Sequence, residues 1–199
     1  DSQQGGFINM QQNKTKRLVG ISLFGALAFV LMFIAFPVIP AFSYLKIDFS
    51  DLPILLSFFL YGPAGGIISA VIRSVLHYLQ TGGDMGYPIG DFASLLATLS
   101  YTLPVYYLLN KAKTKTAVIM ALLTGTLVLT VVLSIANWFI ITPLYMYLLN
   151  FEMGSVKELV LAGILPFNII KGLVVSAVIL LVMPKLKPWL AHNKVPFAQ

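Results

Sequence analysis

The sequence predicts an all-α membrane protein with six transmembrane helices. Of its 199 residues, 58% are hydrophobic and only 10% are charged, whereas soluble domains carry roughly 25% charged residues. The mean hydropathy of +0.89 agrees with a chain that lies largely in lipid. A chain of this length accommodates about six spans of ~20 residues with short connections. We therefore expect one helical domain and no appended ATPase domain.

The first helix is predicted over residues 18–36, a run without charged side chains. This run is longer than the apolar core of a signal peptide and lacks a small-residue cleavage site. Residues 1–9 are interpreted as the remnant of an expression tag, which leaves 10–199 as a single transmembrane domain. Pro37 ends the helix, and the mixed aromatic and charged residues 41–51 predict a structured loop at the membrane interface.

The second and third helices are predicted as a pair joined by a tight turn at 62–63, where glycine precedes proline. Asp51 is placed to cap the first helix of the pair, because a proline follows in its first turn. Its apolar residues 52–61 are few for a complete span, whereas the apolar run 64–79 that follows the turn is longer.

A glycine-rich loop over 81–90 leads to the fourth helix, which is predicted over 92–109 with Asp91 as its cap. A short basic turn then precedes the fifth helix, predicted over 117–141, with Leu149 as an alternative end. A capping-box pattern at 155–158 predicts a short helix that ends before Pro166.

The last helix, predicted over 166–182, carries Asn168 and Lys171 within an apolar run. Because they are three residues apart, the two side chains share one face. An ionisable side chain costs at least ~2.5 kcal/mol near the bilayer centre, so Lys171 is a functional-site hypothesis by default. The alternative is a lysine that snorkels to the nearer headgroups.

The distribution of charge predicts the orientation. Six crossings place both termini and two of the turns on the same side of the membrane. Nine basic residues fall on that side: Lys14, Lys16, Arg17, Lys111, Lys113, Lys115, Lys185, Lys187 and Lys194. The acids outside the tag all fall on the opposite side, so the positive-inside rule predicts cytoplasmic termini.

Three polar loops lie on the predicted outer side, together with Asn137, Asn168 and Lys171. Long loops above polar side chains predict an outward-facing site for a small molecule, with the loops as its cover. Tyr44 suits the lining of such a site, although aromatic residues at this depth more often form an interfacial belt.

Two further charged positions have structural explanations. Asp91, like Asp51, suits a helix cap better than a ligand contact, although we retain Asp91 as a candidate. Arg73 lies near mid-membrane, where pairing within the protein or snorkelling is expected more often than contact with a substrate. In the first helix, Ser22, Gly25 and Ala26 form a small-residue pattern that permits close approach of another helix, either of a partner or within the bundle.

Enzyme signatures are absent from the sequence. It contains no HExxH, GxSxG or Walker lysine and no cysteine, and its two histidines are isolated. With the acids on the outer side, no proton relay crosses the membrane. We therefore expect neither an enzyme nor a metal site.

Four stretches, taken in order and at this spacing, resemble a known family. They are the helix 1 run Ser-Leu-Phe-Gly-Ala-Leu-Ala over 22–28, Lys-Ile-Asp-Phe-Ser-Asp-Leu-Pro over 46–53, Tyr-Gly-Pro-Ala-Gly-Gly over 61–66, and Asn168-x-x-Lys171. The chain from residue 10 to 187 resembles the substrate-binding S components of energy-coupling factor (ECF) vitamin transporters, and its riboflavin-binding members in particular. That family has six helices and cytoplasmic termini.

The resemblance implies a protein of the cell membrane that binds riboflavin at its outer side and uses no other cofactor. It implies docking through the first helix, at Ser22, Gly25 and Ala26, onto a transmembrane coupling subunit that bears two cytoplasmic ATPase subunits. The vitamin would then be released inward. The implied substrate-binding residues are Tyr44, Leu45, Lys46, Asp48, Asp91, Asn137, Asn168 and Lys171.

The residues themselves leave the ligand open. Asn and Lys offer hydrogen bonds to ring atoms and hydroxyl groups, but a lysine also pairs with a carboxylate or a phosphate. Biotin and a phosphorylated flavin such as FMN are therefore alternatives within the same class. A membrane enzyme or assembly subunit whose outer loops bind lipid is the alternative from another class.

Overall fold

A computed structural model describes residues 2–42, 44–150 and 154–192, with side chains from residue 14 onward. It confirms an all-α membrane protein. Within the described residues, five helical runs are long and apolar enough to cross a membrane. They are Lys14–Met32, Asp51–Thr81, Ile89–Leu109, Lys115–Leu149 and Val156–His192.

The first helix, α1 (Ser2–Met32), begins earlier than predicted and ends four residues sooner. It ends because the chain turns into a short antiparallel pair, β1 (Phe36–Pro37) with β2 (Lys46–Ile47). A 3₁₀ turn, η1 (Pro40–Phe42), lies between these strands. The predicted interfacial loop is thus structured, and its residue Ile47 is fully buried.

Helix α2 (Asp51–Thr81) folds back on itself at Gly62, whose φ of 77° and ψ of −177° are not helical. The hydroxyl oxygens of Ser57 and Ser69 lie 2.7 Å apart, although twelve residues of continuous helix span about 18 Å. The two halves, a first arm (51–61) and a second arm (63–81), are therefore antiparallel.

Close contacts hold the two arms together. A Cβ atom at Gly66 would overlap the ring of Phe58, so only glycine allows this approach. Ser69 also donates a hydrogen bond of 2.8 Å to the carbonyl of Ile21 in α1. At the turn, Arg17 donates a hydrogen bond of 2.8 Å to the carbonyl oxygen of Tyr61. Tyr61 ends the first arm, and a cation is favoured at the C-terminus of a helix.

The fourth helix, α3 (Ile89–Leu109), begins before the predicted residue 92. The fifth runs on to Leu149 as α4 (Lys115–Ala136), a π-helical segment η2 (Asn137–Ile141) and α5 (Thr142–Leu149). The last run consists of α6 (Val156–Glu158), a second π segment η3 (Leu159–Ile164) and α7 (Leu165–His192).

Two predicted details of the last run were wrong. The helix that starts after Ser155 does not end before Pro166, because π-helical hydrogen bonding carries the chain into α7 without a break. Ser155 occupies the N-cap position but makes no side-chain capping hydrogen bond, so the predicted capping box does not form.

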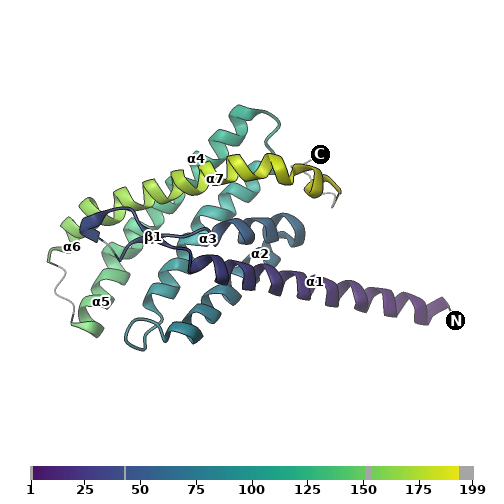
Figure 1. The fold of residues 1–199 in the computed structure, drawn as a ribbon, viewed down its shortest axis with the longest axis horizontal. Helices are drawn as coiled ribbons and strands as arrows, with labels where there is room; N and C mark the ends of the chain where they lie inside the picture. The colour runs from purple at the N-terminus through teal and green to yellow at the C-terminus, as the bar shows by residue number, and fades with distance from the viewer. Residues whose placement is uncertain (1, 43, 151–153, 193–199) are drawn as a thin grey trace.

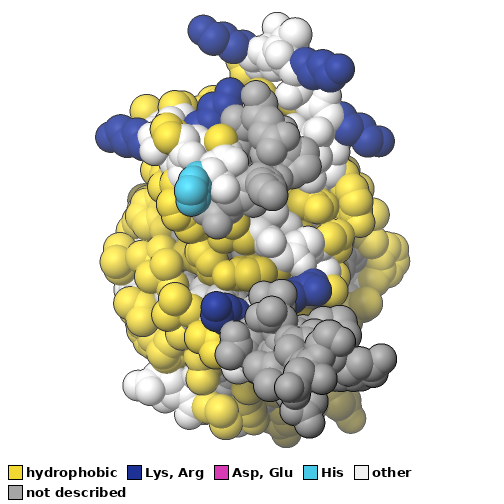
Figure 2. Space-filling view, turned by 90° about the vertical axis from the view of Figure 1, so that its right-hand side faces the viewer, with side chains coloured by type: hydrophobic (Ala, Val, Ile, Leu, Met, Phe, Trp, Pro, Cys, Tyr) yellow, Lys and Arg dark blue, Asp and Glu magenta, His cyan; other side chains and the backbone are white. Residues whose placement is uncertain are grey.

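The start of α1 and the end of α7 lie at the same end of the bundle (Figure 1). Viewed from that end, Lys and Arg side chains surround the helix ends, and no Asp or Glu is visible among the coloured side chains (Figure 2). The short strands, α6 and the α2–α3 connection gather at the opposite end.

Candidate functional site

A cavity of about 1010 Å³ lies at the end of the bundle that carries the strands and α6. Its volume is at the upper limit of ~300–1,000 Å³ that is typical of small-molecule sites. All eight predicted substrate-binding residues line it: Tyr44, Leu45, Lys46, Asp48, Asp91, Asn137, Asn168 and Lys171. They come from four separate parts of the chain, so the fold brings them together; that they bind a ligand stays a prediction.

Both asparagines lie next to π-helical segments. Asn137 opens η2 and Asn168 follows η3 by one turn. Each amide nitrogen donates a hydrogen bond to a carbonyl oxygen of its own helical run. The Asn137 nitrogen donates to Leu133 and the Asn168 nitrogen to Ile164, each over 2.8 Å. The amide oxygens keep lone pairs that can accept hydrogen bonds from a ligand, although Oδ1 of Asn137 also lies 3.5 Å from the Thr142 hydroxyl. π segments often occur at functional sites.

Lys171 is buried and lines the cavity. Its ammonium lies 3.8 Å from Oδ2 of Asp51, and both side chains are less than a tenth exposed. The lysine therefore does not snorkel to the membrane surface. Its burial is tolerated because a carboxylate lies beside it.

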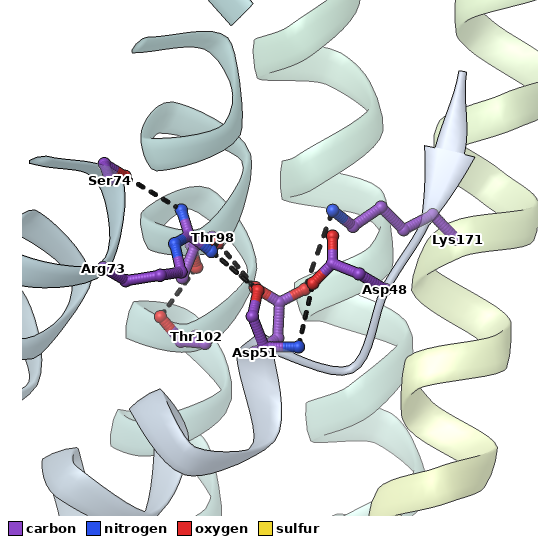
Figure 3. Close-up of polar contacts among 8 residues, drawn as sticks. Asp48, Asp51, Arg73, Ser74, Thr98, Thr102 and Lys171 are labelled. Carbon is purple, nitrogen blue, oxygen red and sulfur yellow. Dashed lines mark hydrogen bonds and ion pairs between the residues drawn. The ribbon is translucent and has the colours of Figure 1, made fainter. Parts of the chain in front are cut away.

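Asp51 does not act as a helix cap. The N-cap position of α2 is held by Ser50, whose side chain makes no capping hydrogen bond. Instead, Oδ1 of Asp51 accepts a 2.6 Å hydrogen bond from Thr98 and lies 3.9 Å from the Arg73 guanidinium. Figure 3 shows Asp51 between Arg73 on one side and Lys171 on the other. The prediction of pairing for Arg73 is confirmed, whereas the capping role of Asp51 was wrong.

Asp91 is likewise not a cap, because Pro88 occupies the N-cap position of α3. The carboxylate of Asp91 lies 2.6 Å from Nδ1 of His77. His77, which the sequence suggested was isolated, thus has an acidic partner, and both line the cavity.

Non-covalent contacts connect the segments that cover the cavity. The ring of Phe42 packs against Gly163 in η3, where a Cβ atom would lie 3.1 Å from it. The hydroxyl of Tyr145 in α5 donates a hydrogen bond of 2.7 Å to Oδ2 of Asp84. The same oxygen also accepts a hydrogen bond from the backbone nitrogen of Gly90. Asp84 and Tyr145 are 61 residues apart, so no local pattern in the sequence connects them.

Asp48 lies in the connection between β2 and α2, where its side chain is buried. Burial alone would raise the pKa of this carboxyl. The Lys171 ammonium is the largest opposing influence, followed by hydrogen bonding to Ser50 and the charge of Arg73, and the net pKa is lowered. Asp48 therefore remains ionised beside Lys171 and helps to balance its charge.

A lowered pKa makes stability dependent on pH. The Asp48 carboxylate stabilises the folded chain above the pKa of the unfolded chain, about 4. This contribution is lost as the pH falls through the lower folded-state pKa. We expect the unfolding temperature of the wild type to exceed that of Asp48→Asn at neutral pH, with a difference that shrinks below about pH 4.

Thermal unfolding of the purified chain across this range measures the effect, with the exposed Glu158→Gln variant as control. An equal difference between wild type and Asp48→Asn at neutral and acidic pH would contradict the proposed charge pairing of Asp48.

The predicted docking residues do not share one environment. Ser22 is exposed and Ala26 is half-buried. Gly25 is buried, and a Cβ atom there would lie 2.8 Å from Ile72 of α2, so Gly25 permits packing within the bundle. Ser22 and Ala26 are the members of the pattern that an outside helix can reach.

A family model for the substrate-specific component of ECF transporters matches residues 16–183 of the chain. The chain belongs to this family. This S component is 39% identical over 184 residues to the Riboflavin transporter FmnP of Bacillus subtilis (strain 168), covering 91% of the chain and 97% of the relative. It is 43% identical over 185 residues to the Riboflavin transporter RibU of Staphylococcus aureus (strain TCH60), covering 92% of the chain and 95% of the relative.

A solved structure of the S component of a bacterial ECF transporter matches the fold with a TM-score of 0.74 and 42% identity. The match covers 89% of this chain and 98% of that one. Family membership confirms the prediction of a membrane transport protein rather than an enzyme.

Proposed function

We propose that this S component is the high-affinity riboflavin-binding subunit of an ATP-driven ECF vitamin transporter in the cell membrane. The observation that carries the proposal is the cavity, which joins apolar walls to a few buried polar groups. Leu133, Ile164 and Phe167 offer apolar surface to a flat ring. Asn137, Asn168 and Lys171 offer acceptors and donors to ring atoms and hydroxyl groups. Relatives that cover nearly the whole chain are named riboflavin transporters.

The charges that line the cavity favour an uncharged ligand. Two lysines, Lys46 and Lys171, face three aspartates, Asp48, Asp84 and Asp91. Asp48 and Lys171 also attract each other, which leaves little positive charge free for a carboxylate or a phosphate. This balance supports riboflavin over biotin or FMN.

The orientation is part of the proposal. Counting the two arms of α2 separately gives six crossings with both termini in the cytoplasm. The basic end seen in Figure 2 supports this orientation through the positive-inside rule. The cavity then opens to the outside and receives the vitamin there, and a coupling subunit with two cytoplasmic ATPases drives its release inward.

Titration of the detergent-purified chain with riboflavin tests the proposal. We expect saturable quenching of flavin fluorescence at one molecule per chain, with FMN and biotin competing weakly or not at all. Absence of saturable quenching by riboflavin would overturn the proposal and favour a lipid-binding membrane subunit.

The docking surface makes a separate prediction. Leucine at Ser22 or Ala26 is expected to abolish riboflavin uptake by cells, because a bulky side chain prevents close helix approach. Riboflavin binding by the isolated variants should be retained, since both positions lie outside the cavity lining. The conservative variants Ser22→Ala and Ala26→Ser keep the small size and should keep uptake. If the leucine variants lose binding as well, these residues support the bundle instead.

A further inference from the structure

Arg73 lies behind the cavity and does not line it. Its side chain, in the second arm of α2, is completely buried. Nη1 donates hydrogen bonds to the hydroxyl oxygens of Ser50, at 2.9 Å, and Thr98, at 2.7 Å. Nη2 donates a hydrogen bond of 3.2 Å to the hydroxyl oxygen of Ser74. Within the described part of the chain, its Nε has no hydrogen-bond partner. A fixed cation thus lies one layer away from the ligand site.

The Thr98 hydroxyl connects Arg73 to Asp51. It accepts from Arg73 and donates to Oδ1 of Asp51 over 2.6 Å (Figure 3). The other oxygen of this carboxylate, Oδ2, lies 3.8 Å from the ammonium of Lys171. One buried carboxylate is therefore shared by two cations, of which Lys171 alone lines the cavity.

The sharing determines how strongly Asp51 attracts Lys171. Arg73 and Lys171 together balance Asp48 and Asp51, so the buried cluster has no net charge. Without Arg73, the cluster would carry one excess negative charge, and the Asp51 carboxylate would be free to draw the lysine ammonium out of the cavity. In a buried site of low dielectric constant, such attraction is strong compared with that in water.

We propose that Arg73 is a positioning residue for ligand binding, which acts through Thr98 and Asp51 to keep the ammonium of Lys171 available to a ligand in the cavity. This inference rests on the proposed function, because riboflavin is the ligand used to test it. It assigns a role in recognition to a side chain that does not reach the ligand.

The test is a riboflavin titration of the full-length purified chain and its variants. We expect Arg73→Met to bind riboflavin about tenfold more weakly than the wild type. Arg73→Met combined with Asp51→Asn restores a neutral cluster and should recover most of that loss. Arg73→Lys keeps the charge and should lie between wild type and Arg73→Met. Ser74→Ala, which removes a contact of Arg73 without touching Asp51, is the matched control and should bind normally.

A purely structural role would give a different pattern, because removing a second buried partner would not rescue binding. Unchanged affinity in Arg73→Met, or a double variant no better than the single one, would overturn the inference. If Arg73→Met does not fold, the riboflavin affinity of Thr98→Val is the deciding measurement. This variant removes the hydroxyl between Arg73 and Asp51 but keeps both charged side chains. Normal affinity in Thr98→Val would also overturn the inference. A wild-type chain that fails to bind riboflavin would instead overturn the proposed function.

Discussion

Replacing Lys171 by methionine is expected to weaken riboflavin binding about 5- to 150-fold, equivalent to ~1–3 kcal/mol. The ammonium is the buried cationic donor at the cavity wall, and methionine retains much of the apolar stem while removing the charge. Asn168→Ala should fall in the same range, because its side-chain oxygen is lost from the same face of α7.

Fluorescence titration of both variants against the wild type measures the loss. Lys157→Met is the matched control, because Lys157 is exposed and lies outside the cavity lining, so its removal leaves no buried charge unbalanced and should not change binding. A Lys171→Met protein that folds and binds riboflavin as tightly as the wild type would remove Lys171 from the site.

Replacing Asp51 by alanine is expected to produce the largest loss of stability, ~3–5 kcal/mol in the free energy of unfolding. The substitution leaves Arg73 and Lys171 buried near each other without the carboxylate between them. It also removes the acceptor of the Thr98 hydroxyl. The cost arises mainly from the desolvated cations rather than from the lost contacts themselves.

Thermal unfolding of the detergent-purified chain, followed by tryptophan fluorescence, measures this loss. Glu158→Ala removes an exposed acid and should change the free energy of unfolding by no more than about 0.5 kcal/mol. Equal unfolding temperatures for Asp51→Ala and Glu158→Ala would show that Asp51 does not balance the buried cations.

The sequence predicted the helical architecture because a bilayer permits few alternatives. Each span must satisfy its own backbone, so apolar length and turn residues locate the helices. The turn at 62–63 was recognisable because glycine and proline restrict the backbone in characteristic ways. The π segments beside Asn137 and Asn168 were not, since a local shift of backbone hydrogen bonds leaves no period in the sequence.

The side chains of the cavity were predicted by polarity within apolar runs, and their partners were not. An aspartate at the start of a helix suggests a cap, which is how Asp51 and Asp91 were misinterpreted. Their partners, Arg73 and His77, lie in the second arm of α2 and reach these carboxylates through the fold of the hairpin. Family resemblance identified candidate residues but gave no account of the ion pairs behind them.

The reversal within α2 has a consequence for how the chain enters the membrane during synthesis. The first arm, at 1.5 Å per residue, is about 16 Å long, roughly half of the ~30 Å hydrocarbon thickness. It begins with an aspartate that is stabilised by Arg73 of the second arm. We therefore expect the two arms to enter the bilayer together as one hairpin rather than as successive spans.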